Sequence, residues 1–151
     1  LGAKKAAQEC DCDFVSSGDT VIDPELLMFY KESYCQDPLE KTGFDGNIWL
    51  WKKPDYNRSY VVTADVSRGD GNDYSAFHII DIESMEQVAE YKGKIEPTDF
   101  GNMLISIATD YNDALLIVDN ANIGWATIQQ ILDRDYKNLF WSNKDVQFLT
   151  L

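Results

Sequence analysis

The sequence predicts an α/β protein in which antiparallel strands come first and a helical crossover leads into parallel strands. Between residues 60 and 95, apolar and β-branched runs alternate with short polar loops, which favours three strands paired antiparallel. After residue 97 the apolar residues recur at steps of three and four, the spacing of an amphipathic helix. A continuous apolar run, Leu115–Val118, then predicts a strand covered on both faces, as in the parallel part of a sheet.

One helix is predicted near the start of the chain, within otherwise irregular structure. Asp23 is a good N-cap, Pro24 suits the first helical position, and an acidic residue follows in the first turn, where it complements the helix dipole. We expect this helix to end near Tyr34. Residues 36–58 carry the glycines and prolines of loops, and within them Ile48–Trp51 is either a short strand or an apolar docking strip.

The remaining elements give the order strand-strand-strand-helix-strand-helix-strand. They are predicted at 60–65, 74–82, 87–95, 98–111, 115–118, 123–134 and 139–141. Crossover connections are right-handed, so the helices pack on the faces of a mixed sheet. The strand at 115–118 can then lie beside the strand at 60–65.

The composition excludes several classes of protein. The chain has 151 residues, 13 Lys and Arg against 26 Asp and Glu, a formal net charge of −13 and 44% hydrophobic residues. It can therefore build a core, and no stretch approaches the ~18–20 apolar residues of a membrane span. The charge argues against a free-standing DNA-coating protein, but not against an enzyme that meets phosphates through metal ions. The three cysteines and the single histidine lack a zinc-binding spacing, and no G-x-x-x-x-G-K-[ST] phosphate loop is present in the sequence.

Two aspartates are the strongest candidates for chemistry because each follows an apolar strand. Asp65 ends the strand at 60–65, and Asp119 follows the strand at 115–118. Neighbouring strands lie ~4.8 Å apart, so both carboxylates would meet at the carboxyl edge of the sheet, where α/β proteins place ligands. Oxygen ligands alone favour Mg²⁺ or Mn²⁺, and a pair of such ions supports phosphodiester hydrolysis. For either aspartate, capping a turn or the next helix is the alternative role.

The loop that follows Asp65 adds further candidates, each with a structural alternative. Its glycines permit close approach to a ligand, and Asp70 and Asp73 are acids without the EF-hand spacing. Arg68 is either a phosphate contact or a solvated turn residue. His78, in the next strand, favours a structural role, and the four tryptophans favour core or interface positions over stacking on bases.

These motifs resemble a known family. Residues 60–80 contain the pattern D-x-S-x-G-x-G-x-D-Y-S-A, which is similar to the opening of the nuclease domain of large terminase subunits from tailed bacteriophages. Ile117–Gly124 resembles the second acidic motif of that family, and Gln8–Thr20 resembles the stretch that closes its ATPase region. The predicted element order is also that of the ribonuclease H-like (RNase H-like) fold, which the resemblance implies.

The resemblance implies a metal-dependent endonuclease that cuts concatemeric viral DNA during genome packaging. Carried over to this sequence, Asp65 would be the first metal-binding aspartate and Asp119 the second, and Asp73 would be an acid close to the metal site. Two ions, Mg²⁺ or Mn²⁺, would bind there, whereas ATP would bind only in an upstream domain outside this chain. The implied partners are double-stranded viral DNA, the portal protein and the small terminase subunit, in the cytoplasm of the host cell and without a membrane.

We expect this chain to be a fragment of a longer polypeptide, truncated at the C-terminus. Residues 1–45 would close the ATPase region and form the hinge, and residues 46–151 would be the first part of the nuclease domain. The third catalytic aspartate of the family has no matching motif among Asp133, Asp135 and Asp145, so the isolated chain would bind metal weakly and cleave little DNA. Two alternatives stay open: another RNase H-fold nuclease, such as a resolvase or exonuclease, and a non-enzymatic acidic interaction module.

Overall fold

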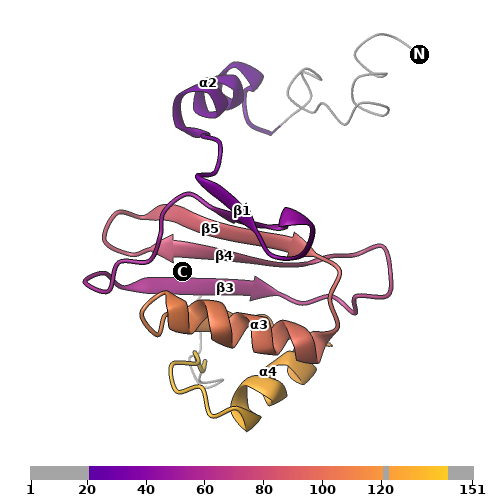
Figure 1. Ribbon diagram of the computed structural model, residues 1–151. Coiled ribbons are helices and arrows are strands. Elements are labelled where there is room, and N and C mark those ends of the chain that lie inside the picture. The colour runs from indigo at the N-terminus through magenta and orange to yellow at the C-terminus, as the bar shows by residue number, and fades with distance from the viewer. Residues whose placement is uncertain (1–20, 121–122, 143–151) are drawn as a thin grey trace, which may run out of the picture. The chain divides into compact units, whose positions relative to one another are not determined.

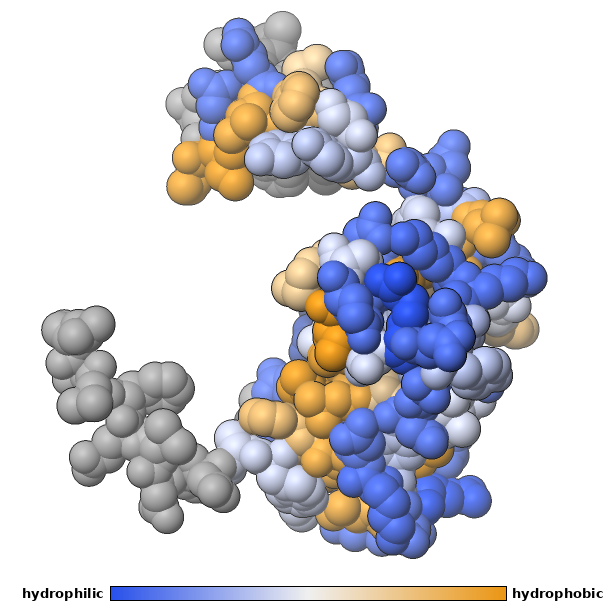
Figure 2. Space-filling model, turned by 90° about the vertical axis from the view of Figure 1, so that its left-hand side faces the viewer, coloured by the Kyte–Doolittle hydropathy of each residue, from blue (hydrophilic) through white to orange (hydrophobic). Residues whose placement is uncertain are grey.

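The computed structural model describes residues 21–120 and 123–142, which fall into two compact units on either side of the Asp37–Pro38 bond. The first unit contains helix α2 (Pro24–Tyr34), which confirms the helix predicted there. Its N-cap is Asp23, whose side chain accepts a hydrogen bond from the backbone N–H of Glu25 at 2.8 Å. None of the helix residues is buried, and Phe29 is 53% exposed. Figure 2 shows that apolar side chains, in orange, reach the molecular surface.

The second unit is built on a six-stranded mixed sheet with the strand order β1-β2-β5-β4-β3-β6 (Figure 1). The strands are β1 (Glu40–Thr42), β2 (Ile48–Leu50), β3 (Tyr60–Asp65), β4 (Ser75–Asp81), β5 (Glu86–Gly93) and β6 (Leu115–Val118). Among these six strands only β3 and β6 pair in parallel, and the other neighbouring strands are antiparallel. The predicted α/β class with three antiparallel strands before the crossover is therefore confirmed.

The start of the sheet differs from the sequence-based expectation. Within the run at Ile48–Trp51, residues Ile48–Leu50 form the strand β2, which pairs with β5 and so extends the sheet beyond the three predicted antiparallel strands. Its other neighbour is β1, within a segment that the sequence predicts as loop, and a short 3₁₀ turn, Phe44–Gly46, joins the two. All three residues of β1 are exposed polar residues, so no apolar pattern marks this strand.

The hydrophobic core lies between one face of the sheet and two helices, α3 (Pro97–Asp110) and α4 (Gly124–Asp133). On β3 the residues Tyr60, Val62 and Ala64 are buried, and they belong to the same core cluster as the buried apolar residues of both helices. Figure 1 shows α3 running alongside the sheet with α4 next to it. The helices are joined by a hydrogen bond from Thr127 Oγ1 to the carbonyl oxygen of Pro97 at 2.9 Å.

The other face of the sheet carries polar side chains beside partly buried apolar ones. Thr63 of β3 lies opposite His78 of β4, and His78 lies opposite Glu90 of β5. His78 is exposed, with Nδ1 3.1 Å from Gln87 Oε1, so it is a partnered surface residue rather than part of the core. Two of the four tryptophans, Trp125 and Trp141, are also more than half exposed and do not belong to the core of the described residues.

The final predicted strand is reduced to one bridge. Leu139 is buried and pairs in parallel with Leu116 of β6, and the backbone N–H of Phe140 donates to Leu116 O at 2.9 Å. No regular strand forms at 139–141. Within the described ranges, no helix has the length and apolar character that crossing a membrane requires.

Candidate functional site

Asp65 and Asp119 lie side by side at the carboxyl edge of the sheet. The parallel pairing of β3 and β6 places Ala64 opposite Val118, and the backbone N–H of Asp119 donates to the carbonyl oxygen of Ala64 at 3.0 Å. Both aspartates are exposed. The prediction that these two strands are parallel neighbours is therefore confirmed, and it brings together the two acids that the strands deliver.

The position of Asp119 depends on a glycine at the start of the next helix. A Cβ built on Gly124 would lie 1.9 Å from the carbonyl oxygen of Asp119, far inside van der Waals contact. Only a residue without a side chain lets the first turn of α4 pack so closely against the end of β6. Gly124, the last residue of the second acidic motif, thus fixes the backbone at the edge of the sheet.

The loop between β3 and β4 is held by hydrogen bonds and packs closely against the chain at one glycine. The backbone N–H of Ser67 donates to Ser75 Oγ at 3.0 Å, and Ser67 Oγ donates to the carbonyl oxygen of Asp73 at 3.4 Å. Gly69 has a φ of +79°, and a Cβ there would lie 2.3 Å from the carbonyl oxygen of Ile95. The anchored loop places Asp73 in the lining of the same pocket as Asp65.

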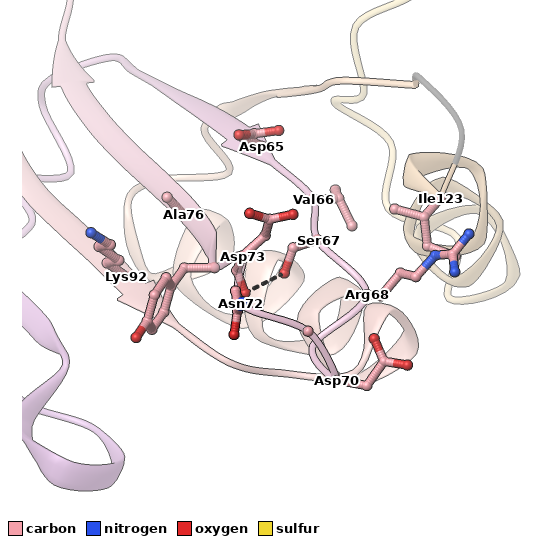
Figure 3. A pocket seen from close by; sticks show the side chains of 12 residues that line it. Asp65, Val66, Ser67, Arg68, Asp70, Asn72, Asp73, Ala76, Lys92 and Ile123 are labelled. Atoms are coloured by element: carbon pink, nitrogen blue, oxygen red, sulfur yellow. Dashed lines mark hydrogen bonds between the residues drawn. The ribbon is translucent and has the colours of Figure 1, made fainter.

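The loop and the adjoining strands form a pocket of about 880 Å³. Its acidic lining residues are Asp65, Asp70 and Asp73. Figure 3 shows Asp65 and Asp73 in the middle of the view, with Arg68 and Lys92 towards opposite ends. The loop after Asp65 thus lines a space large enough for a ligand.

A second, smaller pocket of about 420 Å³ is lined by both of the aspartates predicted to bind metal. Asp65 and Asp119 line it together with Thr63, His78 and Ile117. Asp65 lines both pockets, whereas Asp73 lines only the larger and Asp119 only the smaller of the two. The structure therefore brings Asp65 together with each of the other two predicted acids, and Asp65 is the shared element.

The donor chemistry of this edge suits a hard divalent cation, but the described residues do not complete a site. Two exposed carboxylates at adjacent strand ends are the oxygen ligands that Mg²⁺ and Mn²⁺ prefer. Across residues 21–120 and 123–142, no group of three or more His, Cys, Asp or Glu is placed to hold a metal. Asp133 and Asp135 are exposed near the far end of α4 and line neither pocket, and Asp145 lies outside the described residues.

Two residues of the larger pocket escape sequence-based prediction as functional groups. Lys92 lines the pocket, and its Nζ lies 5.0 Å from the centre of the Tyr74 ring, which also lines the pocket. A second ammonium, that of Lys94, lies 5.5 Å from the same ring. Tyr74 is part of the motif quoted above, but the strand pairing that carries Lys92 towards Asp65 has no signature in the sequence.

The chain thus has an α/β fold with aspartates at the carboxyl edge of its sheet. Among solved structures it is similar to the large terminase nuclease from thermophilic phage G20c, with a TM-score of 0.59 and 19% identity over 69% of this chain and 53% of that one. It is also similar to the same nuclease with bound magnesium, with a TM-score of 0.58 and 21% identity over 69% of this chain and 52% of that one. The nuclease domain of the Thermus phage P74-26 large terminase matches with a TM-score of 0.56 and 21% identity, over 72% of this chain and 53% of that one.

These likenesses show the fold of large terminase nuclease domains. This chain spans about half the length of the solved structures that it matches. No family model matches the sequence.

Proposed function

We propose that this chain is part of the nuclease domain of a phage large terminase subunit, and that the complete subunit cuts viral DNA during genome packaging. The observation that carries the proposal is the pairing of Asp65 with Asp119 at the ends of two adjacent parallel strands. The fold shared with large terminase nucleases and the D-x-S-x-G-x-G-x-D-Y-S-A pattern support it. The substrate is double-stranded concatemeric DNA, and the other partners would be the portal protein and the small terminase subunit, in the cytoplasm of the host cell.

The proposed site uses carboxylates to hold divalent cations against a DNA phosphate. Asp65 would bridge the site because it lines both pockets, Asp119 would bind from β6, and Asp73 would bind or orient from the loop. Bound Mg²⁺ or Mn²⁺ would supply an activated water and stabilise the leaving oxygen. A further ligand would come from outside the described residues, since these hold no group of three suitable side chains.

The test is Asp65→Asn in the complete protein, with Asp110→Asn as a matched control. Asn keeps the size of the side chain but loses the charge, so DNA cleavage with Mg²⁺ or Mn²⁺ should fall below detection. Asp65 is exposed, so the melting temperature should stay close to that of the parent. Asp110, at the exposed end of α3, lines neither pocket, and its variant should cleave normally. Cleavage by Asp65→Asn near the parental rate would refute the assignment.

A crystal soak separates an enzyme from an acidic interaction module. Mn²⁺ should give anomalous density beside Asp65 and Asp119 in the parent and none there in Asp65→Asn. Finding no ion beside this pair in the parent, at millimolar Mn²⁺, would favour the non-enzymatic alternative.

A further inference from the structure

A lysine lies in the same cross-strand row as the central aspartate. Asp65 of β3 pairs with Ala76 of β4, and Ala76 pairs with Lys92 of β5, so the three residues share one face of the sheet. All three line the larger pocket. Two strand spacings separate the Asp65 and Lys92 backbones, about 10 Å. Because the residue between them is alanine, no large side chain blocks the space from the lysine to the carboxylate.

Across the pocket from Lys92 lies a second cation. Figure 3 shows Arg68 on the Ile123 side of the pocket and Lys92 on the opposite side, with Asp73 between them. Both cations are exposed, and neither takes part in an ion pair within the described ranges. In a chain of net charge −13, two such cations at opposite sides of a pocket lined by aspartates are available to an anionic ligand.

The ring of Tyr74 lies beside two lysine ammonium groups at the Lys92 side of the pocket. The ammonium groups of Lys92 and Lys94 lie 5.0 and 5.5 Å from its centre, within the range of cation–π attraction. Tyr74 is itself about half exposed, so it stays accessible beside the two ammoniums. This arrangement concentrates positive charge at the β5 side of the pocket.

We propose that Lys92 and Arg68 form a clamp on the DNA backbone, each binding a phosphate that flanks the one held at the acidic site. The inference rests on the proposed nuclease function and names the residues that position its substrate. Phosphates carry no sequence information, so the clamp sets the register and orientation of the strand rather than the sequence that is cut. Both residues are positioning residues, because the acids act on the scissile phosphate and the cations hold its neighbours.

The experiment measures DNA binding rather than cleavage. The complete protein is titrated against a fluorescently labelled duplex with Ca²⁺ in place of Mg²⁺, over a series of salt concentrations. The variants are Lys92→Ala and Arg68→Ala, and the matched controls are Lys137→Ala and Arg134→Ala. Both controls remove an exposed cation that lines neither pocket.

Each clamp variant should bind the duplex roughly tenfold more weakly, the effect of losing one charge-assisted contact. The slope of log K against log salt should also become shallower by about 0.9, the value for one lost phosphate contact on B-DNA. The controls should leave both quantities unchanged. Equal slopes for parent, clamp variants and controls would overturn the clamp, as would a loss of the same size in the controls.

Substitutions at Tyr74 provide a second test of the clamp through DNA binding. Tyr74→Leu should weaken binding in the same direction as Lys92→Ala, whereas Tyr74→Phe, which keeps the aromatic face, should bind like the parent. Failure of the clamp can be told apart from failure of the proposed function, because the latter is decided by cleavage in Asp65→Asn. If that variant loses cleavage while Lys92 and Arg68 do not affect the salt slope, only the clamp is wrong.

Discussion

Replacing Gly124 by alanine should disable the site by moving Asp119. The new Cβ would lie 1.9 Å from the carbonyl oxygen of Asp119, whereas ordinary contact begins at 3.4 Å. The backbones must separate by about 1.5 Å, the difference between these two distances. The opposing atom is a backbone oxygen, so no side-chain rotation can relieve the clash. Either the start of α4 or the end of β6 has to give way.

The expected loss of cleavage rate in Gly124→Ala follows from how strongly catalysis depends on the geometry of the site. A misplacement of 1 Å costs about 10²-fold in rate, so Gly124→Ala in the complete protein should cleave DNA at least about 10²-fold more slowly. Overpacking at such a site also costs about 1–3 kcal/mol of folding stability. The assays are plasmid cleavage with Mg²⁺ under single-turnover conditions and thermal unfolding followed by circular dichroism.

Two glycine variants separate displacement of the acid from a general loss of stability. Gly101→Ala places its Cβ 3.0 Å from Gln130 Cβ, between α3 and α4, and should destabilise the fold without moving Asp119. Gly71→Ala meets nothing nearer than 4.0 Å and should be close to neutral for stability. If Gly124→Ala remains folded and cleaves at the parental rate, the packing of α4 does not position Asp119 and the reasoning is wrong. An equal loss of activity in Gly101→Ala would refute it as well.

Two further predictions concern the fold around the site. Gly69→Ala combines a φ of +79° with a Cβ 2.3 Å from the carbonyl oxygen of Ile95, so it should destabilise the protein by more than about 1 kcal/mol in urea unfolding. An unchanged midpoint of urea unfolding would show that the loop is not anchored at Gly69. The hydrogen bond from Arg58 holds the pKa of the buried Asp81 carboxyl well below its usual range, so the pair stabilises the fold above about pH 4 and loses this contribution as the pH falls towards the lowered pKa. The melting temperature of Arg58→Ala should therefore fall below that of the parent by more at pH 7 than at pH 2, and a gap that does not narrow in acid would contradict this.

The acids could be predicted from the sequence because apolar strands have a strong signal at their ends. Tyr60–Ala64 and Leu115–Val118 are apolar or β-branched throughout, so the first charged residue after each run marks the edge of the sheet. The same reasoning fails for Glu40–Thr42, because an exposed edge strand of polar residues is held by backbone hydrogen bonds alone. It also predicts a strand at Leu139–Trp141, where the three apolar residues form only a single bridge, because Leu139 is buried whereas Phe140 and Trp141 are exposed.

The lysine opposite the acids shows why a register is harder to predict than a strand. β5 contains two consecutive buried residues, Val88 and Ala89, which break the alternation that would assign its faces. The structure resolves this by a β-bulge on pairing with β4, between Ile79 and Ile80. Such bulges re-aim the side chains that follow them and occur often beside active sites.

The bulge decides which residue of β5 faces the pocket. Near the hairpin turn Asp81 pairs with Glu86, and continuing that register would set Ala76 opposite Tyr91 and turn Lys92 towards the buried face. With the bulge, Ala76 pairs with Lys92, and Tyr91 stacks on Phe77 in the core with ring centroids 5.5 Å apart. One extra residue thus buries the aromatic ring and presents the ammonium to the acids. Pairing at this level of detail depends on packing across three strands, which the sequence of any one of them does not contain.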